Sequence, residues 1–172
     1  MQVPDARTKI VTLDALVARR AAWRRAGRTV VWTNGCFDIV HIGHIRNLEA
    51  AAGQGDVLVV GLNSDASVRR LKGPSRPVVP QDERAELIAS LSCVDHVYVY
   101  DDDTAIPALT RLQPEIYCKG AEYAPPHGRF VPEAETVRAY GGELRYLPQI
   151  PGRSTTEMLR RLETIESPAS GS

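Results

Sequence analysis

The chain has 172 residues, and its 21 Lys and Arg balance its 21 Asp and Glu, so the formal net charge at pH 7 is zero. A chain of this length fits one domain with a substantial buried core. A balanced charge gives no sign of a basic surface for nucleic acid or for an anionic membrane. We therefore expect no nucleic-acid partner and no membrane partner.

The first predicted element is an amphipathic helix over residues 13–25, for which packing or dimerisation is the expected role. Short β-branched runs then alternate with helical patterns. The predicted strands are 30–33, 57–62, 96–100, 115–118 and 143–147, and the predicted helices are 45–52, 66–71, 81–91, 105–112 and 132–140. This alternation predicts an α/β fold of the Rossmann-like kind, a parallel five-stranded sheet with helices on both faces.

The organisation we expect is an N-terminal helical segment over residues 1–28, one domain over 29–166 and a disordered tail over 167–172. No internal repeat is visible. Three cysteines lie in or beside apolar runs and lack metal-ligand spacing, which favours reduced thiols and a cytoplasmic location. No apolar stretch approaches membrane-spanning length, and the N-terminus lacks the order of a signal peptide.

Polar segments follow three of the predicted strands. They are the residues after Thr33, the pair Asn63 and Asp65, and the pair Lys119 and Gly120. Parallel sheets bind ligands outside the carboxyl ends of their strands, at a switch in strand order. We therefore expect one rim of the sheet to gather all three segments.

The most informative segment reads TNGCFDIVHIGH over residues 33–44. Gly35 is expected to allow a turn that a side chain would forbid, and Gly43 to let phosphate oxygens approach a helix N-terminus. His41 and His44 are three residues apart and share one face of the first helical turn. Two imidazoles beside free helix amides would supply donors for developing negative charge, so the segment favours phosphoryl chemistry.

Structural interpretations compete with this functional one. A single histidine at a helix start is usually a cap or a surface residue, and a single glycine usually serves a turn. The H-x-G-H spacing directly after a strand and a turn favours function for the set. Cys36 and Phe37, in contrast, are of residue types that favour packing over chemistry.

Four ordered blocks, TNGCFDIVHIGH, LNSDASVRRLKGPSRPV, CKGAEY and GRSTTEML, resemble the HxGH nucleotidyltransferase superfamily. Within it they are similar to the cytidylyltransferase-like branch, and in particular to the adenylyltransferase domains that make ADP-heptose for lipopolysaccharide. The resemblance spans residues 29–162. It implies a cytoplasmic enzyme that joins a nucleoside monophosphate from ATP to a sugar 1-phosphate, heptose 1-phosphate, and releases pyrophosphate.

The resemblance also implies ligands and partners. ATP is the co-substrate and brings Mg²⁺ with it, so no residue of the chain is assigned as a metal ligand. A homodimer is the expected assembly. Relatives are often fused to a sugar kinase, for which a chain of 172 residues has no room, so we expect a separate kinase upstream in the pathway.

Matching positions give the candidate site residues. The resemblance assigns catalysis to His41, His44 and Lys72. It assigns nucleotide and phosphate binding to Thr33, Asn34, Gly35, Phe37, Asp38, Gly43, Asn63, Asp65, Arg76, Arg84, Lys119, Gly120, Glu122, Ser154, Thr155 and Thr156.

Several of these roles have alternatives. Arg76 fits a phosphate contact or a solvated basic loop, and Arg84 fits a nucleotide contact or an intrahelical ion pair. Lys119 follows an apolar run and is expected to bind phosphate, either of the nucleotide or of the sugar. Asp38 could orient a histidine or touch the metal. Ser154 is also an expected N-cap, with Glu157 completing a capping box.

Two rival functions stay open. One is an enzyme of the same fold that transfers a cytidylyl group from CTP to a small alcohol phosphate or phosphonate. Cytidylyl-transferring relatives carry an arginine five residues before their Ser-Thr-Thr, whereas this chain has Gln149, which favours ATP. The other rival is a nucleotide-binding regulatory module without turnover.

Overall fold

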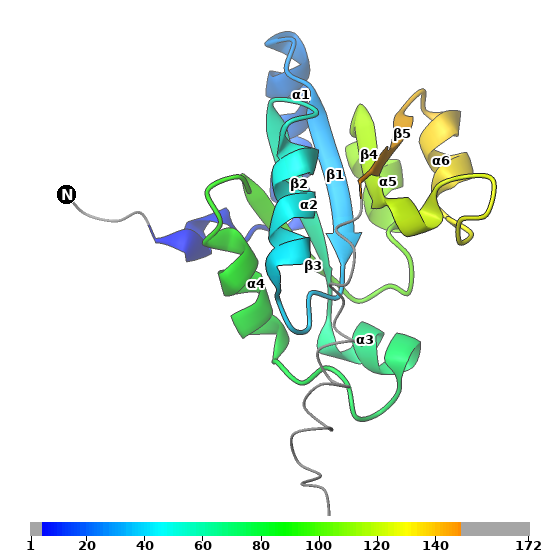
Figure 1. Ribbon diagram of the computed structural model, residues 1–172. Helices are drawn as coiled ribbons and strands as arrows, with labels where there is room; N and C mark the ends of the chain where they lie inside the picture. The colour runs from blue at the N-terminus through cyan, green and yellow to red at the C-terminus, as the bar shows by residue number, and fades with distance from the viewer. Residues whose placement is uncertain (1–4, 149–172) are drawn as a thin grey trace, which may run out of the picture.

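The computed structural model describes residues 5–148, and it contains one five-stranded sheet (Figure 1). The strands are β1 (Val30–Gly35), β2 (Val57–Asn63), β3 (His96–Tyr100), β4 (Ile116–Gly120) and β5 (Glu143–Leu147). Every pairing is parallel, and the order is β3-β2-β1-β4-β5. The predicted fold class is confirmed, because each predicted strand has its counterpart in this sheet.

The helices also follow the predicted order. They are η1 (Ala6–Lys9), α1 (Leu13–Arg25), α2 (Ile42–Ala52), α3 (Asp65–Lys72), α4 (Gln81–Ala89), α5 (Ile106–Leu112), η2 (Ala121–Tyr123) and α6 (Ala134–Ala139). The largest difference from prediction is at α2, which begins one turn earlier because His41 caps it. Helices α4 and α6 are shorter than predicted. At α6 the Glu133 carboxylate accepts a hydrogen bond from the backbone of Ala105 rather than from α6 itself.

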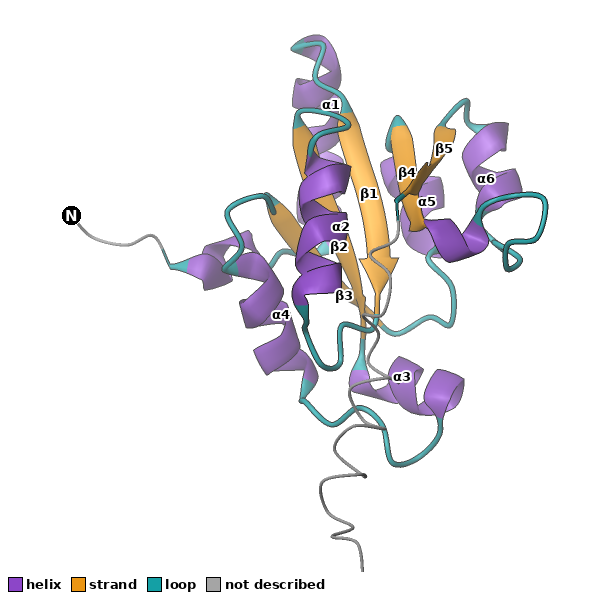
Figure 2. Cartoon of the chain, viewed as in Figure 1, coloured by secondary structure: helices purple, strands orange, loops and turns teal. Residues whose placement is uncertain are grey.

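Two apolar cores lie on opposite faces of the sheet. Side chains alternate along each strand, so Val30 and Trp32 join one core while Val31 joins the other. Helices α1, α5 and α6 cover the first core, and α2 and α4 cover the second (Figure 2). All seven residues of β2 are buried, as expected for a strand covered on both faces.

Helix α1 belongs to the same core as the sheet. Leu13, Leu16 and Trp23 are buried. The buried Arg20 donates to the carbonyl of Leu112 at 3.1 Å and forms an ion pair with Glu115. The packing role predicted for this helix is therefore confirmed. Within residues 5–148, no helix combines the length and the apolarity needed to cross a membrane.

The order of the strands creates the crevice that ligands use in such sheets. The chain runs outward from β1 to β2 and β3, then crosses back to place β4 and β5 on the other side of β1. The connections after β1 and β4 therefore leave in different directions at the carboxyl edge, which opens a space between them.

Candidate active site

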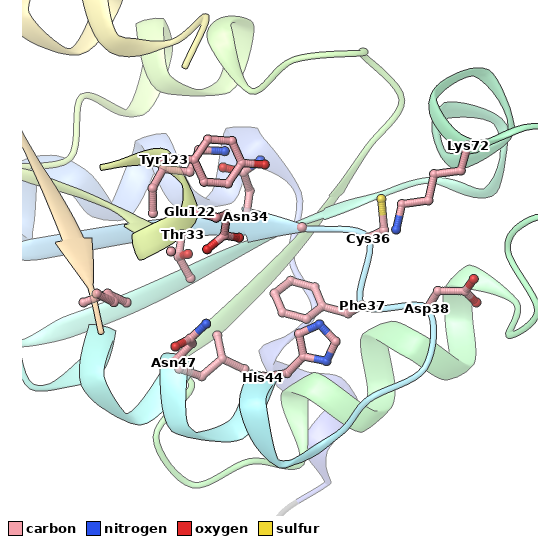
Figure 3. A pocket seen from close by; sticks show the side chains of 15 residues that line it. Thr33, Asn34, Cys36, Phe37, Asp38, His44, Asn47, Lys72, Glu122 and Tyr123 are labelled. Carbon is pink, nitrogen blue, oxygen red and sulfur yellow. The ribbon is translucent and has the colours of Figure 1, made fainter. Parts of the chain in front are cut away.

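A cavity of about 200 Å³ lies at the carboxyl ends of β1 and β4 (Figure 3). It is lined by Thr33, Asn34, Gly35, Cys36, Phe37, Asp38, His44, Asn47, Leu48, Lys72, Lys119, Gly120, Glu122, Tyr123 and Leu147. The rim therefore gathers the segments after β1 and after β4, as predicted. The segment after β2 contributes only Lys72, at the end of α3, whereas the predicted Asn63 and Asp65 do not line the cavity. His41 does not line it either.

The two histidines are held by the backbone of the turn that they begin. His41 is the N-cap of α2, and its Nδ1 accepts a hydrogen bond from the N–H of Gly43 at 3.1 Å. The Nδ1 of His44 accepts from the N–H of His41 at 3.4 Å. The rings stack with their centroids 3.9 Å apart. Because each Nδ1 is an acceptor, each neutral ring carries its proton on Nε2 and is a hydrogen-bond donor there.

The environment of His44 keeps its ring neutral. Burial lowers the pKa of His44 to about 4, and the nearby charges of His41 and Lys72 act in the same direction. The Phe37 ring meets the His44 ring edge-on, with centroids 5.3 Å apart. At neutral pH, His44 is therefore an uncharged donor and a poor base.

Gly35 acts differently from the prediction. Gly35 continues β1, and the left-handed backbone conformation falls on Phe37, with φ of 47°. A Cβ on Gly35 would come within 3.3 Å of the Phe37 ring, so Gly35 makes room for that ring. The N–H of Gly43 donates to His41 in the cap of α2, and the approach of phosphate to Gly43 stays a prediction.

Asp38 and Arg76 connect the loop after β1 to the loop before α4. The buried Asp38 carboxylate accepts hydrogen bonds from the N–H groups of Val78 at 2.7 Å and Val79 at 3.1 Å. It also pairs with the Arg76 guanidinium at 2.6 Å. Figure 3 shows the Asp38 side chain directed away from His44. Arg76 is thus not a solvated loop residue, because its side chain is only 14% exposed and pairs with Asp38. Its contact with phosphate stays a prediction.

Arg84 lies under the rim with no exposed surface. It donates to the carbonyls of Cys36 at 2.5 Å, Asn63 at 2.9 Å and Val79 at 2.9 Å, and it pairs with Asp65 at 2.8 Å. Neither sequence alternative describes this geometry. Arg84 joins the ends of β1 and β2 to the start of α3 and to the loop before α4, and Asp65 serves as its counter-charge.

A buried chain of hydrogen bonds forms the floor of the cavity. The Tyr117 hydroxyl donates to Asn34 Oδ1 at 2.7 Å, and Asn34 Nδ2 donates to the Tyr100 hydroxyl at 3.0 Å. The Tyr100 hydroxyl donates to Asn63 Oδ1 at 3.2 Å, and Asn63 Nδ2 donates to Ser67 at 3.0 Å. The amides of Asn34 and Asn63 are thus committed to other side chains, and they stiffen the strand ends.

Two lysines approach the cavity from different elements. Lys72 is the last residue of α3, and Figure 3 shows it reaching toward Cys36. The Lys119 ammonium lies 5.2 Å from the Tyr117 ring centroid and 5.0 Å from that of Tyr123. Burial lowers the pKa of Lys119, and the negative charges of Glu133 and Glu122 oppose this shift.

Some lining residues escaped the sequence analysis. Asn47 follows His44 by three residues on the same helix face, a spacing that could have indicated it. Tyr123 had no local signal of its own. Cys36 lines the cavity although packing was expected, and burial raises the pKa of its thiol. The predicted phosphate residues Ser154, Thr155 and Thr156, together with Gln149, lie outside the described residues.

Comparison with known proteins agrees with this geometry. The family model for cytidylyltransferase-like proteins matches residues 32–161, which include every residue that lines the cavity. The chain belongs to the cytidylyltransferase-like family and is a nucleotidyltransferase.

Among curated proteins, the chain is 45% identical over 161 residues to the bifunctional protein HldE of Geotalea uraniireducens, covering 94% of this chain and 32% of that protein. It is 49% identical over 139 residues to HldE of Syntrophotalea carbinolica, covering 81% and 28%. The chain thus spans about a third of the length of these relatives.

A solved structure is similar as well. It is the crystal structure of the lipopolysaccharide core biosynthesis protein from Thermoplasma volcanium GSS1, with a TM-score of 0.57 and 28% identity. The match covers 72% of this chain and 98% of that chain. The family resemblance drawn from the four sequence blocks is therefore confirmed.

Proposed function

We propose that the protein transfers the adenylyl group of ATP to heptose 1-phosphate. A phosphate oxygen of the sugar phosphate attacks the α-phosphorus of ATP, the bond to the β-phosphate oxygen breaks, and pyrophosphate leaves. The observation that carries the proposal is the capped histidine turn, in which the Nδ1 atoms of His41 and His44 are engaged, their Nε2–H groups are donors, and His44 lines the cavity.

The protonation state of His44 fits this reaction. The attacking phosphate is already an anion at neutral pH, so the reaction needs no general base. A histidine whose pKa is about 4 would be a poor base but a good neutral donor. In the proposed mechanism it donates to oxygens of the triphosphate as negative charge builds up on them.

The two lysines would supply the positive charge. Lys72 reaches the cavity from α3 and Lys119 from β4, so they flank the space in which the phosphates would sit. In the proposal they offset charge during an in-line transfer, where catalysis is mainly positioning and electrostatic stabilisation. Mg²⁺ would arrive with ATP, as the resemblance to the superfamily implies.

The buried charged residues would act on the substrate indirectly. Asp38 and Arg76 fix the loop before α4 against the histidine turn, and Arg84 with Asp65 ties the strand ends together. We therefore assign positioning roles to these residues in place of the direct phosphate contacts implied by the resemblance.

The choice of acceptor rests on the relatives. Both HldE proteins and the lipopolysaccharide core biosynthesis protein support a sugar phosphate of that pathway, and the four sequence blocks resemble domains that use heptose 1-phosphate. A sugar kinase acting upstream would supply the 1-phosphate.

The test is pyrophosphate release from ATP, CTP, GTP and UTP, each with heptose 1-phosphate, glycerol 3-phosphate or no acceptor. We expect release with ATP and heptose 1-phosphate, and little release without an acceptor. A preference for CTP with glycerol 3-phosphate would support the cytidylyltransferase alternative. Binding of nucleotide without any release would support the regulatory module.

A further inference from the structure

The hydrogen-bond chain beneath the cavity crosses four adjacent strands and reaches a helix. Its members are Tyr117 of β4, Asn34 of β1, Asn63 of β2, Tyr100 of β3 and Ser67 of α3. Four of them are at most 4% exposed and do not line the cavity. Asn34 is the exception, because it is partly exposed and lines the cavity (Figure 3). The chain therefore reaches a ligand only through Asn34.

The helical end of the chain sets the direction of its hydrogen bonds. The Ser67 hydroxyl lies 2.9 Å from the backbone carbonyl of Asp102, which can only accept, so the single hydroxyl proton is used there. Ser67 Oγ must then accept from Asn63 Nδ2 at 3.0 Å, which turns Asn63 Oδ1 toward Tyr100. The Tyr100 hydroxyl consequently donates its proton to Asn63 Oδ1 at 3.2 Å.

The same reasoning fixes the side-chain amide of Asn34. The Tyr100 hydroxyl has already donated its one proton, so it accepts from Asn34 Nδ2, which lies 3.0 Å away. Asn34 Oδ1 faces the other side and accepts from the Tyr117 hydroxyl at 2.7 Å. An amide nitrogen carries two N–H groups, and the described residues provide an acceptor for one of them. The second Nδ2–H of Asn34 is therefore available to a ligand in the cavity.

Two features of the surroundings keep this arrangement in place. Burial raises the pKa of Tyr100 and that of Tyr117, so both hydroxyls hold the protons that the chain requires. Gly61 of β2 is paired with Asn34 in the register of the sheet. A Cβ on Gly61 would lie 3.1 Å from the Cβ of Asn34 and 2.3 Å from the Trp32 ring. The missing side chain leaves room for Asn34 to reach across β2 to Tyr100.

We propose that Tyr100 is a positioning residue, which acts through this chain to hold Asn34 with one Nδ2–H directed at an oxygen atom of the bound nucleotide. An Asn34 amide that was free to turn over would present its oxygen for part of the time, and an acceptor cannot bind a phosphate oxygen. The use of Asn34 in nucleotidyl transfer rests on the proposed function, whereas the orientation of its amide does not.

A chain that only stabilised the fold would behave differently. Tyr100→Phe removes the hydroxyl and keeps the ring, so it frees the Asn34 amide from its partner at Nδ2. The matched control is Tyr98→Phe, because Tyr98 lies on the same strand, stacks on Tyr100 with ring centroids 6.3 Å apart and is outside the chain. A structural role alone predicts that Tyr100→Phe lowers Tm while the folded protein contacts nucleotide normally.

The first experiment observes the Asn34 amide by NMR in protein labelled with ¹⁵N-asparagine, with Asn34→Ala to identify its signals. In the free protein, NOEs from the Nδ2 protons should be stronger to the Tyr100 ring than to the Tyr117 ring. Addition of ATP and Mg²⁺ should shift one Nδ2 proton, and this shift should be smaller in Tyr100→Phe but kept in Tyr98→Phe. Stronger NOEs to Tyr117, no shift with ATP, or an equal shift in Tyr100→Phe would overturn the proposal.

The second experiment is a double-mutant cycle with Asn34→Ala that measures kcat/KM for pyrophosphate release. In the wild-type background, Tyr100→Phe should lower kcat/KM about tenfold, the order expected for one lost hydrogen bond to a charged group. In the Asn34→Ala background it should have little further effect, because no amide remains to be positioned. Ser67→Ala, at the end of the chain away from the cavity, should lower kcat/KM by a smaller factor. Additive losses for Tyr100 and Asn34 would contradict the positioning role.

The two proposals can fail separately. If no nucleotide and acceptor combination gives pyrophosphate, the proposed function fails, while the NOEs and the shift on addition of ATP still report on the orientation and use of Asn34. If turnover occurs and Tyr100→Phe has the same kcat/KM as Tyr98→Phe, the function stands and the role of Tyr100 is wrong.

Discussion

The two walls of the cavity are built in different ways. The wall at α2 presents His44, and the Nδ1 atoms of His44 and of the neighbouring His41 accept hydrogen bonds from backbone N–H groups within the same turn. The wall at β4 presents Lys119, whose ammonium lies between Tyr117 and Tyr123. The first arrangement is local in sequence, and the second depends on side chains from different elements.

This difference separates two kinds of electrostatic support. Imidazole donors fixed by the backbone are pre-organised at one position, which suits stabilisation of charge that develops there. A lysine on a flexible stem is a point charge that can follow a phosphate group as it moves. We expect substitutions at the histidine wall to affect the chemical step most, and substitutions at the lysines to affect binding and transfer together.

The largest effect is expected from a substitution beneath the histidine wall, the side of the cavity formed by α2. Arg84→Met should lower the free energy of unfolding by about 3–5 kcal/mol, because it removes the buried partner of the Asp65 carboxylate and leaves two strand-end carbonyls without a donor. Urea denaturation measures this loss, with the exposed Arg25→Met as control. A loss below about 1 kcal/mol would show that the Arg84 bonds do not stabilise the rim.

The histidine wall itself is tested by His44→Ala. We expect kcat to fall by about 10²–10³ with little change in ATP affinity, since loss of one donor aimed at developing charge acts mainly in the transition state. Steady-state kinetics and nucleotide titration separate the two effects. Arg46→Ala, on the exposed side of the same helix, is the control. Weakened ATP binding with normal kcat would make His44 a ground-state ligand.

A smaller effect is expected for Lys72→Met. This change keeps the aliphatic stem and removes the charge at the cavity, so kcat/KM should fall about tenfold, which corresponds to ~1.4 kcal/mol. Arg69→Met, on an exposed position of the same helix, should leave kcat/KM unchanged. Equal losses in both variants would mean that the general positive charge of α3 matters rather than the placement of Lys72.

The smallest effect is expected from a test of whether the His44 ring is uncharged at neutral pH. In an NMR titration, His44 should show a midpoint near pH 4, well below the ordinary value of 6.5. Its unfolded form binds the proton more readily, so its contribution to stability is complete above pH 6.5 and is lost as pH falls toward 4. His44→Gln should therefore flatten the dependence of Tm on pH in that window. A midpoint above 7 would make His44 a mostly charged donor at neutral pH.

Much of this protein follows from its sequence alone. Period-two and helical patterns predicted the five strands and the order of the helices, because those patterns record which face of each element is buried. The H-x-G-H spacing predicted the paired histidines, because a capped helix turn is assembled from neighbouring residues. The position of Lys119 after an apolar strand predicted its place on the rim.

The roles of the buried charges were set only by tertiary structure. Arg84 meets Cys36, which is 48 residues away, and Asp38 meets Val79, which is 41 residues away. No periodicity in the sequence encodes such pairs. The sequence shows Arg84 near a helix start, but only the fold buries its side chain and supplies its hydrogen-bond acceptors. The same holds for Glu133, whose carboxylate meets the backbone N–H of Ala105, 28 residues away, only once α6 has packed against the sheet. Burial removes water from each of these charges, so each needs an oppositely charged or hydrogen-bonding partner. Only the folded chain determines which partner is within reach.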